Sequence, residues 1–343
     1  MIYFFTKGSE DVPSSRRRIF YLAKYLENFG YQSKIFVPTH RPWWNLSIER
    51  FKEAIQNIKI LSGLKKEDTL YLHRPVYQLD FIIIVIFFRL ILRKKYIFDF
   101  DDPIFLHSPV KTYILTKLAT SVVVGGHFLY DYAVKINKNT KIIPMLVDTE
   151  NTEAIKNDFE EKPIYNIGWI GDGKIHFRNL EIIKPVIEGL LTQNIDFKLI
   201  LIGAKGHRPV YELFNIPGLK KEIIDWLKPE EVGDQLVRFD VALTPLIQSQ
   251  WEEGKCPLKT YEYMQHGIPT IVSNVGEAKH FIKNGQNGFL AADTQDWIKE
   301  ITEIIRDRKL AQTISANSLS TIKQNFSYQS HLQSYQEIFS AKN

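Results

Sequence analysis

Strand-length apolar runs alternate with helical patterns twice along the 343-residue chain, and this doubled alternation is the feature that most restricts its fold. The first series starts with residues 2–6, continues through a helical pattern and reaches a second apolar run at 33–38. The second series starts at 166–170 and continues with runs at 197–203 and 241–246. Strands that alternate with helices form parallel sheets covered on both faces. The sequence therefore predicts an α/β protein with two α/β/α units.

Chain length and a change in composition predict where the two units divide. A chain of 343 residues suggests two domains of roughly 100–200 residues each. After Val147 the sequence turns polar as far as Glu161, which is typical of a linker. We therefore expect domains at residues 1–155 and 156–325. Residues 326–343 have helical spacing, and the helix that they predict is long enough to reach back to the first domain.

Composition excludes several classes of protein. The formal net charge is only +5, and the basic clusters Arg16–Arg18 and Arg93–Lys95 are too short to indicate a nucleic-acid site. The only cysteine, Cys256, excludes an internal disulfide and a zinc cluster built on cysteines. Residues 1–8 lack the pattern of a signal peptide, so we expect a cytoplasmic location.

One apolar segment in the first half raises the question of membrane contact. Phe81–Phe88 is an uninterrupted apolar run, much shorter than the roughly 20 residues of a spanning helix. Arg93–Lys95 follow it, and Trp43 and Trp44 precede it. The segment predicts either a helix packed in the core or a surface helix in peripheral contact with the inner face of the cell membrane.

Residues 254–272 have the pattern of a loop, a helix, a turn and a buried strand. Pro257 suits the first turn of a helix, Gly267 suits its end, and Pro269 prevents its continuation. The polar stripe on this helix consists of Lys255, Lys259, Glu262 and His266. Lysines at the positive end of a helix dipole are unfavourable unless an anionic ligand binds there. A solvated outer face is the alternative interpretation.

Two further loops have the composition of anion sites. Gly171–Asp172–Gly173 lies between a strand and a helix near Leu180, and its backbone N–H groups could approach a phosphate, although it matches no complete phosphate-binding motif. Ser14–Arg18 opens the first helix and predicts the docking of an anion such as a substrate phosphate. The arginines could instead be solvated or pair with Glu10 and Asp11.

The first half also contains an acidic cluster and a histidine, both expected where strands end. Asp99 and Asp101 could hold a divalent metal that carries a diphosphate, or the cluster with Asp102 could cap the next segment. His127 follows a Gly-Gly turn and either faces a substrate or caps a helix. In both cases the residues alone leave the two interpretations open.

The segment Gly254–Gly276 carries the strongest resemblance to a known family. Lys-Cys-Pro-Leu-Lys, Tyr-Glu-Tyr-Met and His-Gly-Ile-Pro-Thr-Ile-Val-Ser-Asn resemble the donor-site motif of the family 4 retaining glycosyltransferases, which belong to the glycosyl transferases group 1 and have the GT-B fold. Supporting similarities lie at Ser15–Arg18, Asp99–Asp102, Gly168–Gly171 and Phe239–Leu246. The resemblance covers most of the chain.

The resemblance implies a function for each domain. The first Rossmann-like domain would bind a glycan or lipid-linked saccharide acceptor of polysaccharide or cell-envelope biosynthesis, and the second would bind a UDP- or GDP-sugar. The implied donor-binding residues are Gly171, Gly173, Arg178, Trp226, Lys255, Pro257, Leu258, Lys259 and Glu262. The implied acceptor-binding residues are Ser15, Arg16, Arg18 and His127. The implied catalytic residues are Lys259, Arg178, Asp101 and Glu253, with no metal and no cofactor.

One position departs from the family pattern. Glu262 matches the second glutamate of the family's E-x7-E motif, which binds the donor ribose, but Gly254 stands at the position of the first. A shifted Glu253 or backbone N–H groups from residues 254–258 would have to replace that contact. This departure also motivates an alternative, a catalytically silent subunit that binds a nucleotide-sugar. A two-lobed solute-binding protein and a sugar-nucleotide epimerase are further alternatives.

Overall fold

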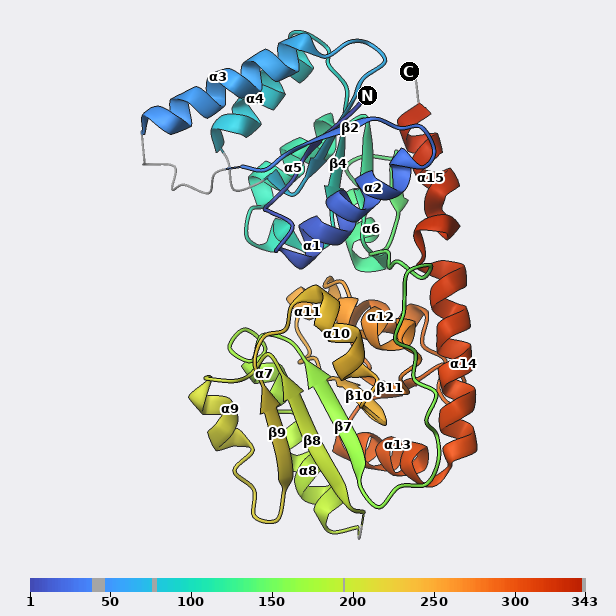
Figure 1. Cartoon of the computed structure of the whole chain (residues 1–343). Coiled ribbons are helices and arrows are strands. Elements are labelled where there is room, and N and C mark those ends of the chain that lie inside the picture. Colours follow the sequence, from blue (N-terminus) through green and yellow to red (C-terminus); the bar gives the residue numbers. More distant parts are fainter. Residues whose placement is uncertain (39–46, 76–78, 194, 341–343) are drawn as a thin grey trace. The chain divides into compact units, whose positions relative to one another are not determined.

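The computed structural model describes residues 1–38, 47–75, 79–193 and 195–340, so Trp43 and Trp44 lie outside the described residues. Two compact units are distinguished by their internal contacts. Unit 1 comprises Met1–Leu146, Gly254–Cys256 and His331–Asn343, and unit 2 comprises Val147–Glu253 and Pro257–Ser330. Figure 1 shows the helices and strands of both units.

Unit 1 has a parallel sheet with helices on both faces (Figure 1). Its strands are β1 (Ile2–Phe5), β2 (Ser33–Phe36), β3 (Thr69–His73), β4 (Tyr96–Phe100), β5 (Ser121–Val124) and β6 (Thr140–Ile142). Its helices before the linker are α1 (Pro13–Ser15), the π-helix η1 (Arg16–Tyr21), α2 (Leu22–Glu27), α3 (Ile48–Gly63), α4 (Leu79–Leu90), the 3₁₀ helix η3 (Ile104–Leu106), α5 (Pro109–Leu118) and α6 (His127–Ala133).

The strand order of this sheet is β2-β1-β3-β4-β5-β6. The chain passes from β1 to one side of the sheet and returns to the other side through β3, so the order reverses between these two strands. In open α/β sheets a ligand binds outside the carboxyl ends of the strands at such a switch point. The ends of β1 and β3 are therefore the first place to look for a site.

The strands of unit 1 are apolar because both faces of the sheet are buried. Leu70 and Leu72 of β3 pack with Phe98 of β4 against Phe81 and Val85 of α4. This pattern of near-continuous apolar strands is the one that parallel sheets require. The Phe81–Phe88 run therefore forms one buried face of a helix, although several of its other side chains are exposed.

The last helix, α15 (Tyr328–Ser340), belongs to unit 1 from His331 onward. The Phe339 ring packs against Tyr31 and Tyr71, with ring centroids 5.8 and 6.3 Å apart. Tyr335 is 2% exposed in the same layer. The predicted return of the terminal helix to the first domain is thus confirmed.

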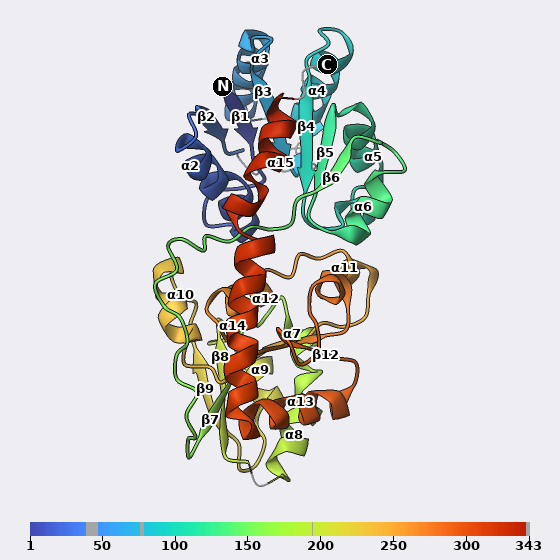
Figure 2. The same ribbon diagram turned by 90° about the vertical axis from the view of Figure 1, so that its right-hand side faces the viewer.

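Unit 2 contains a second parallel sheet with its own helices (Figure 1). Its strands are β7 (Tyr165–Ile170), β8 (Phe197–Ile202), β9 (Lys220–Ile224), β10 (Val241–Thr244), β11 (Thr270–Ser273) and β12 (Phe289–Ala291). Its helices are α7 (Phe177–Leu180), α8 (Ile183–Leu191), α9 (Arg208–Leu213), α10 (Pro229–Leu236), α11 (Gln250–Glu253), α12 (Leu258–Gln265), the 3₁₀ helix η4 (Gly276–His280), α13 (Thr294–Arg306) and α14 (Arg308–Asn325). Figure 2 shows α14 running beside α12 and α13.

The strand order in unit 2 is β12-β11-β10-β7-β8-β9, with its switch point between β7 and β10. Successive residues of β8 belong to two different cores. Leu199 and Leu201 pack with Trp297 of α13, while Ile200 and Ile202 pack with Tyr263 of α12. The sheet is therefore sealed on both faces, and a ligand can reach it only from an edge.

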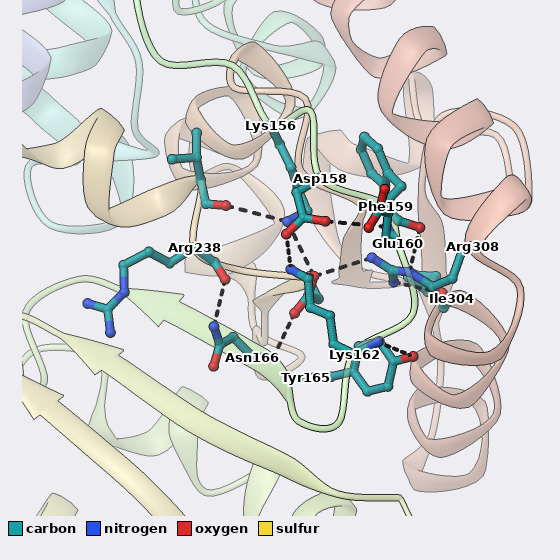
Figure 3. A network of polar contacts seen from close by, with 12 residues as sticks. Lys156, Asp158, Phe159, Glu160, Lys162, Tyr165, Asn166, Arg238, Ile304 and Arg308 are labelled. Atoms are coloured by element: carbon teal, nitrogen blue, oxygen red, sulfur yellow. Dashed lines mark hydrogen bonds and ion pairs between the residues drawn. The ribbon is translucent and has the colours of Figure 1, made fainter.

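The polar segment predicted as a linker is tied to unit 2. Residues 148–164, all within the described part of the chain, form neither helix nor strand. Three cations, Lys156, Lys162 and Arg308, converge on one carboxylate, as Figure 3 shows. That carboxylate is the fully buried Asp240, 3.1 to 3.3 Å from the three nitrogens, and it also accepts a hydrogen bond from the Asn166 N–H. The segment is thus held by ion pairs.

Candidate functional site

The carboxyl edge of the unit 2 sheet brings Lys259 to the end of β7. Nζ of Lys259 lies 4.4 Å from the centroid of the Trp169 ring, and this distance is typical of a cation–π contact. Trp169 is buried inside β7, and Gly171 follows the strand directly. The predicted glycine loop and the predicted polar helix, far apart in sequence, therefore meet at the switch point of the sheet.

Gly171 is required at this position for two reasons. Its φ of +154° lies in a region that residues with a side chain rarely adopt. In addition, a Cβ at this residue would lie 2.4 Å from Nζ of Lys259. The absence of a side chain leaves that space to the lysine, and the ammonium group therefore lies against the first turn of the loop.

Helix α12 places the rest of the predicted polar stripe. Its first residue is Leu258, with Pro257 at the N-cap, and Gly267 after its end has a φ of +68°. Tyr263 fixes the helix to the sheet, because its buried hydroxyl accepts a hydrogen bond of 2.9 Å from the Ile170 N–H. Lys259, four residues before Tyr263, reaches the same end of β7, and Lys259 and Glu262 are both half-buried. The helix thus presents an ammonium and a carboxylate one turn apart.

Other predicted donor-binding residues follow neighbouring strands of the same sheet. Trp226 comes shortly after β9 and is 62% exposed. Its indole ring lies near Gly203, where a Cβ would be 3.2 Å from Cε3. Gly173 packs closely on Ala204 at the end of β8, and Arg178 of α7 is exposed. An exposed aromatic ring and an exposed guanidinium thus lie at the same sheet edge as Lys259.

The loop after β7 is held by its own aspartate. Oδ1 of Asp172 accepts hydrogen bonds of 2.8 and 3.0 Å from the N–H groups of Lys174 and Ile175. Side chains of this kind stabilise a tight turn without other elements. Asp172 therefore has a structural role in this loop.

The two glutamates before Gly254 are both engaged inside unit 2. Glu253 accepts a hydrogen bond of 3.1 Å from the Gly276 N–H and forms an ion pair of 2.9 Å with Lys279. Glu252 is buried and accepts a hydrogen bond of 3.3 Å from Nδ2 of Asn179. Each carboxylate therefore fixes a neighbouring turn or helix. The predicted catalytic role of Glu253 would have to be combined with these contacts.

A second polar group lies at the switch point of unit 1. Nδ1 of the buried His73 is 3.3 Å from Oγ1 of Thr6, and its Nε2 is 3.5 Å from Oδ1 of Asp101. Nη1 of Arg74 lies 3.0 Å from that same oxygen and 2.6 Å from Oδ2 of Asp102. The ends of β1, β3 and β4 are thus joined by one network.

Two pKa values in this group are shifted. Burial would raise the pKa of the Asp101 carboxyl, but the Arg74 guanidinium and His73 outweigh burial and hold the pKa well below its usual range. Burial lowers the pKa of the Lys7 ammonium, Arg74 lowers it further, and Asp102 and Asp101 act in the opposite direction. Asp101 is therefore ionised at neutral pH. Shifted groups gathered at a sheet edge are typical of functional sites.

Sequence reasoning missed His73, Arg74 and Lys7. Arg74 has a φ of +51°, a strained conformation for a residue with a side chain, and Pro75 follows it. His73 is the last residue of β3, and Arg74 and Pro75 follow it. A His-Arg pair matches no recognised motif, so no functional role follows from the sequence alone.

The buried location of Arg18 does not fit the predicted docking of an acceptor anion on this guanidinium. β4 extends through Phe100, so Asp99 lies inside the strand and points into the unit. Nε of Arg18 donates a hydrogen bond of 2.9 Å to Asp99, and Nη2 bonds to the other carboxylate oxygen. Nη1 donates to the carbonyl oxygens of Ile143 and Pro144. Arg18 is 2% exposed and Asp99 is fully buried, so this pair joins the helical segment η1 to the sheet.

The same geometry bears on the metal interpretation of the acidic cluster. Asp99 and Asp101 are two residues apart on one strand end, yet each has a guanidinium of its own, from Arg18 and Arg74 respectively. Their charges are balanced by protein groups. The carboxylates are thus accounted for as members of two ion pairs.

The remaining predicted acceptor residues are spread over the start of two helices. Ser15 is buried, and its Oγ accepts a hydrogen bond of 3.2 Å from the Gly8 N–H. Arg16 opens the π-helical turn η1 and is half-buried, and His127 opens α6 and is exposed. Ser15 therefore shapes the loop after β1, while Arg16 and His127 retain surface area for a ligand.

Comparisons with known proteins match part of unit 2 to a family. Residues 165–307 match the family model of the glycosyl transferases group 1. Spore coat protein SA of Bacillus subtilis is 22% identical over 43% of this chain. The chain spans 41% of the length of that curated relative. The predicted resemblance to the group is confirmed, and membership of family 4 stays a prediction.

Solved structures match along the whole chain. The Anabaena protein HepE, determined with UDP and glucose, is 15% identical with a TM-score of 0.68, covering 99% of this chain and 100% of that one. The lipopolysaccharide outer core galactosyltransferase WaaB is 16% identical with a TM-score of 0.69, covering 99% of both chains. Together with the two parallel sheets, these matches confirm the predicted GT-B fold.

Proposed function

We propose that this protein is a retaining, metal-independent glycosyltransferase that transfers a hexose from a UDP- or GDP-sugar to a glycan or lipid-linked saccharide. The observation that carries the proposal is the position of Lys259 against Gly171 at the switch point of unit 2. That switch point lies within the segment that matches the family model of the glycosyl transferases group 1. A nucleotide-sugar donor is supported by the similarity to HepE, which was determined with UDP-glucose.

The chemistry follows from the charge of the leaving group. When the bond between the anomeric carbon and the diphosphate breaks, negative charge builds up on the diphosphate oxygens. Lys259, Arg178 and the N-terminus of α12 would stabilise that charge, as fixed cations and dipoles do. Glu262 would accept hydrogen bonds from the ribose hydroxyls, and Trp226 would stack on the base. Lys255 and the backbone at Pro257 and Leu258 would line the donor.

The acceptor is assigned to the carboxyl edge of unit 1. Asp102, whose side chain is 20% exposed, and the half-buried Lys7 offer an acceptor and a donor of hydrogen bonds there. Asp101 orients Arg74 and is itself nearly inaccessible. We therefore infer that Asp101 acts by positioning Arg74, while Asp102, Lys7, Arg16 and His127 contact the saccharide.

A transfer screen tests the proposal. UDP- and GDP-hexoses are incubated with a panel of glycan and lipid-linked acceptors, and the anomeric configuration of any product is read by NMR. Retention of configuration and unchanged rates with EDTA are expected. Inversion, or a requirement for a divalent cation, would contradict the mechanism.

One competing function is a silent subunit that binds the donor without transferring the sugar. The structural contacts made by the carboxylates of Glu252 and Glu253 favour it. Donor binding without transfer to any acceptor would support that alternative, a silent subunit.

A further inference from the structure

Helices α3 and α4 expose an unusual amount of apolar surface. Of the 21 large apolar side chains that are exposed in the described part of the chain, ten belong to α3, α4 and the turn after α4. They are Ile48, Phe51, Ile55, Ile58, Leu79, Ile83, Phe87, Leu90, Ile91 and Leu92. We call this set the α3–α4 face. The two helices are neighbours in unit 1 (Figure 1).

The spacing within each helix shows that this exposure is organised. Ile48, Phe51, Ile55 and Ile58 recur at intervals of three and four along α3, which is the spacing of one helix face. In α3 only Leu61 is buried, so the apolar stripe of this helix lies outside the core. A stripe of this kind normally packs against something, and large exposed apolar patches mark interaction surfaces.

Helix α4 also has an exposed apolar face, but its opposite face is apolar and buried. Leu79, Ile83, Phe87 and Leu90 follow intervals of four, four and three and are 40 to 58% exposed. Phe81, Ile82, Val85 and Phe88 form the buried face of the same helix. One side of α4 therefore packs into the core, and the side that is exposed is apolar as well.

Cations adjoin the apolar side chains. Lys52 and Lys59 are exposed and stand one turn after Ile48 and Ile55. The turn after α4 runs from Ile91-Leu92 directly into Arg93-Lys94-Lys95. Leu92 also lines a cavity of about 580 Å³ at the amino ends of β3, β4 and β5. The charged residues around that cavity are the cations Lys65, Lys66, Arg93, Lys94 and Lys95 and the acids Glu67 and Asp68.

We infer that the α3–α4 face, with its rim of cations, docks onto an anionic phospholipid membrane. Apolar side chains enter the boundary between headgroups and acyl chains, and nearby lysines and arginines attract the anionic headgroups. The basic cavity beside Leu92 accommodates a phosphate-bearing headgroup. Charge complementarity selects this occupant, because five of the seven charged residues that line the cavity are cations. Among the described residues no helix is long and apolar enough to cross a membrane. The contact proposed for the α3–α4 face lies at the membrane surface.

The inference is independent of sugar transfer and can fail separately from it. Co-sedimentation is measured with vesicles of phosphatidylcholine alone and of phosphatidylcholine with phosphatidylglycerol. The wild-type protein is expected to bind the anionic vesicles at least about tenfold more tightly, and high salt is expected to weaken the binding. Failure to sediment with anionic vesicles, or equal binding to both, would overturn the inference.

Two double variants separate the apolar and the charged contributions. Phe51→Ser with Phe87→Ser, and Lys59→Glu with Lys95→Glu, are each expected to reduce vesicle binding about tenfold or more. Their matched controls are Val110→Ser with Tyr113→Ser, and Lys135→Glu with Lys138→Glu, on exposed positions elsewhere in unit 1. Equal losses in the controls would contradict the inference.

A second copy of the chain is the competing occupant of the α3–α4 face. Light scattering of the wild-type protein distinguishes it. A stable dimer that the Phe51→Ser, Phe87→Ser variant converts to a monomer would show that the face is an interface between copies, and would overturn membrane docking. UDP binding by calorimetry confirms in the same samples that the variants are folded.

Discussion

The carboxyl edges of the two sheets differ in how they treat charge. In unit 1 the charged groups neutralise one another, since Arg18 pairs with Asp99 and Arg74 pairs with Asp101 and Asp102. In unit 2 the strands β7 and β8 run directly into glycines with positive φ, Gly171 and Gly203, and an ammonium group lies over an aromatic ring at the first of them. At the edge of unit 1 the protein's own charges are paired, and these pairs fix the shape of the surface. At the edge of unit 2 the backbone turns and cations leave room for an anion.

The buried ion pair of unit 1 should have the largest effect on stability. Asp99→Asn leaves the guanidinium of Arg18 buried without a counter-charge, and removing one partner of a buried pair costs about 3–5 kcal/mol. Urea unfolding followed by circular dichroism would measure the loss. Glu337→Gln in the exposed pair with Lys141 is the control and should change little. Similar losses for both variants would show that burial does not govern the contribution.

Glu300, in unit 2, is a buried carboxyl group whose pKa is raised, whereas the pKa of the buried Asp101 in unit 1 is lowered. It is 5% exposed, and burial, followed by the charge of Asp296, raises its pKa from 4.5 to about 8. Because the folded state holds the proton more tightly than the unfolded state, stability should fall as pH rises from about 4.5 to about 8. Glu300→Gln should remove this dependence and stabilise the protein by about 1–3 kcal/mol above pH 8.

Thermal unfolding between about pH 4 and pH 9 measures the Glu300 effect, because this range spans the shift from 4.5 to about 8. Glu230→Gln, at an exposed position of α10, is the control and should leave the pH dependence intact. If wild-type stability were flat over this range, the raised pKa of Glu300 would be refuted.

A substitution at Gly171 tests whether this edge of the unit 2 sheet binds a ligand or only forms a turn. Gly171→Ala puts a methyl carbon 2.4 Å from the present position of Nζ of Lys259 and forces the ammonium group to move, so donor affinity should fall about tenfold or more, a change of roughly 1.4 kcal/mol. Gly206→Ala is the control, because Gly206 also has a positive φ, of +79°, but a Cβ there meets nothing within 4 Å. Calorimetry with UDP and GDP should show a loss for the first variant alone. Equal losses would mean that backbone strain, and not the lysine, explains the result.

Trp226 should give the smallest effect. Stacking of a base on an aromatic side chain contributes about 1–3 kcal/mol, and the lower end is expected for a ring that is 62% exposed. Trp226→Ala should therefore weaken UDP or GDP binding several-fold without altering the unfolding temperature. Tyr211→Ala, at another exposed aromatic residue of unit 2, should leave binding unchanged. Unaltered binding by Trp226→Ala would remove this residue from the donor site.

The amino-acid sequence was sufficient for the architecture of both sheets. The predicted apolar runs 2–6 and 197–203 form strands within a residue of the prediction because burial on both faces demands continuous apolar sequence. Helix α12 was predictable from Pro257 and Gly267, whose backbone preferences are local. Backbone preferences of this kind depend on the residue itself and change little with the rest of the fold.

Contacts between distant segments were not predictable. The sequence could not show that Asp99 pairs with Arg18, because the pairing depends on how far β4 extends and on which face the aspartate points. It also gave no sign that Lys156, Lys162 and Arg308 share the carboxylate of Asp240. In both cases burial decides the role of a charged residue, and burial is a property of the whole fold.

The central claim is that Lys259 binds the diphosphate of a nucleotide donor at the edge of unit 2. Calorimetry of wild type and Lys259→Ala with UDP or GDP, and with the corresponding nucleoside, tests this most directly. The account predicts that the variant loses diphosphate affinity about tenfold or more while nucleoside affinity is nearly unchanged. Equal losses for both ligands, or no binding of any nucleoside diphosphate by the wild-type protein, would contradict it.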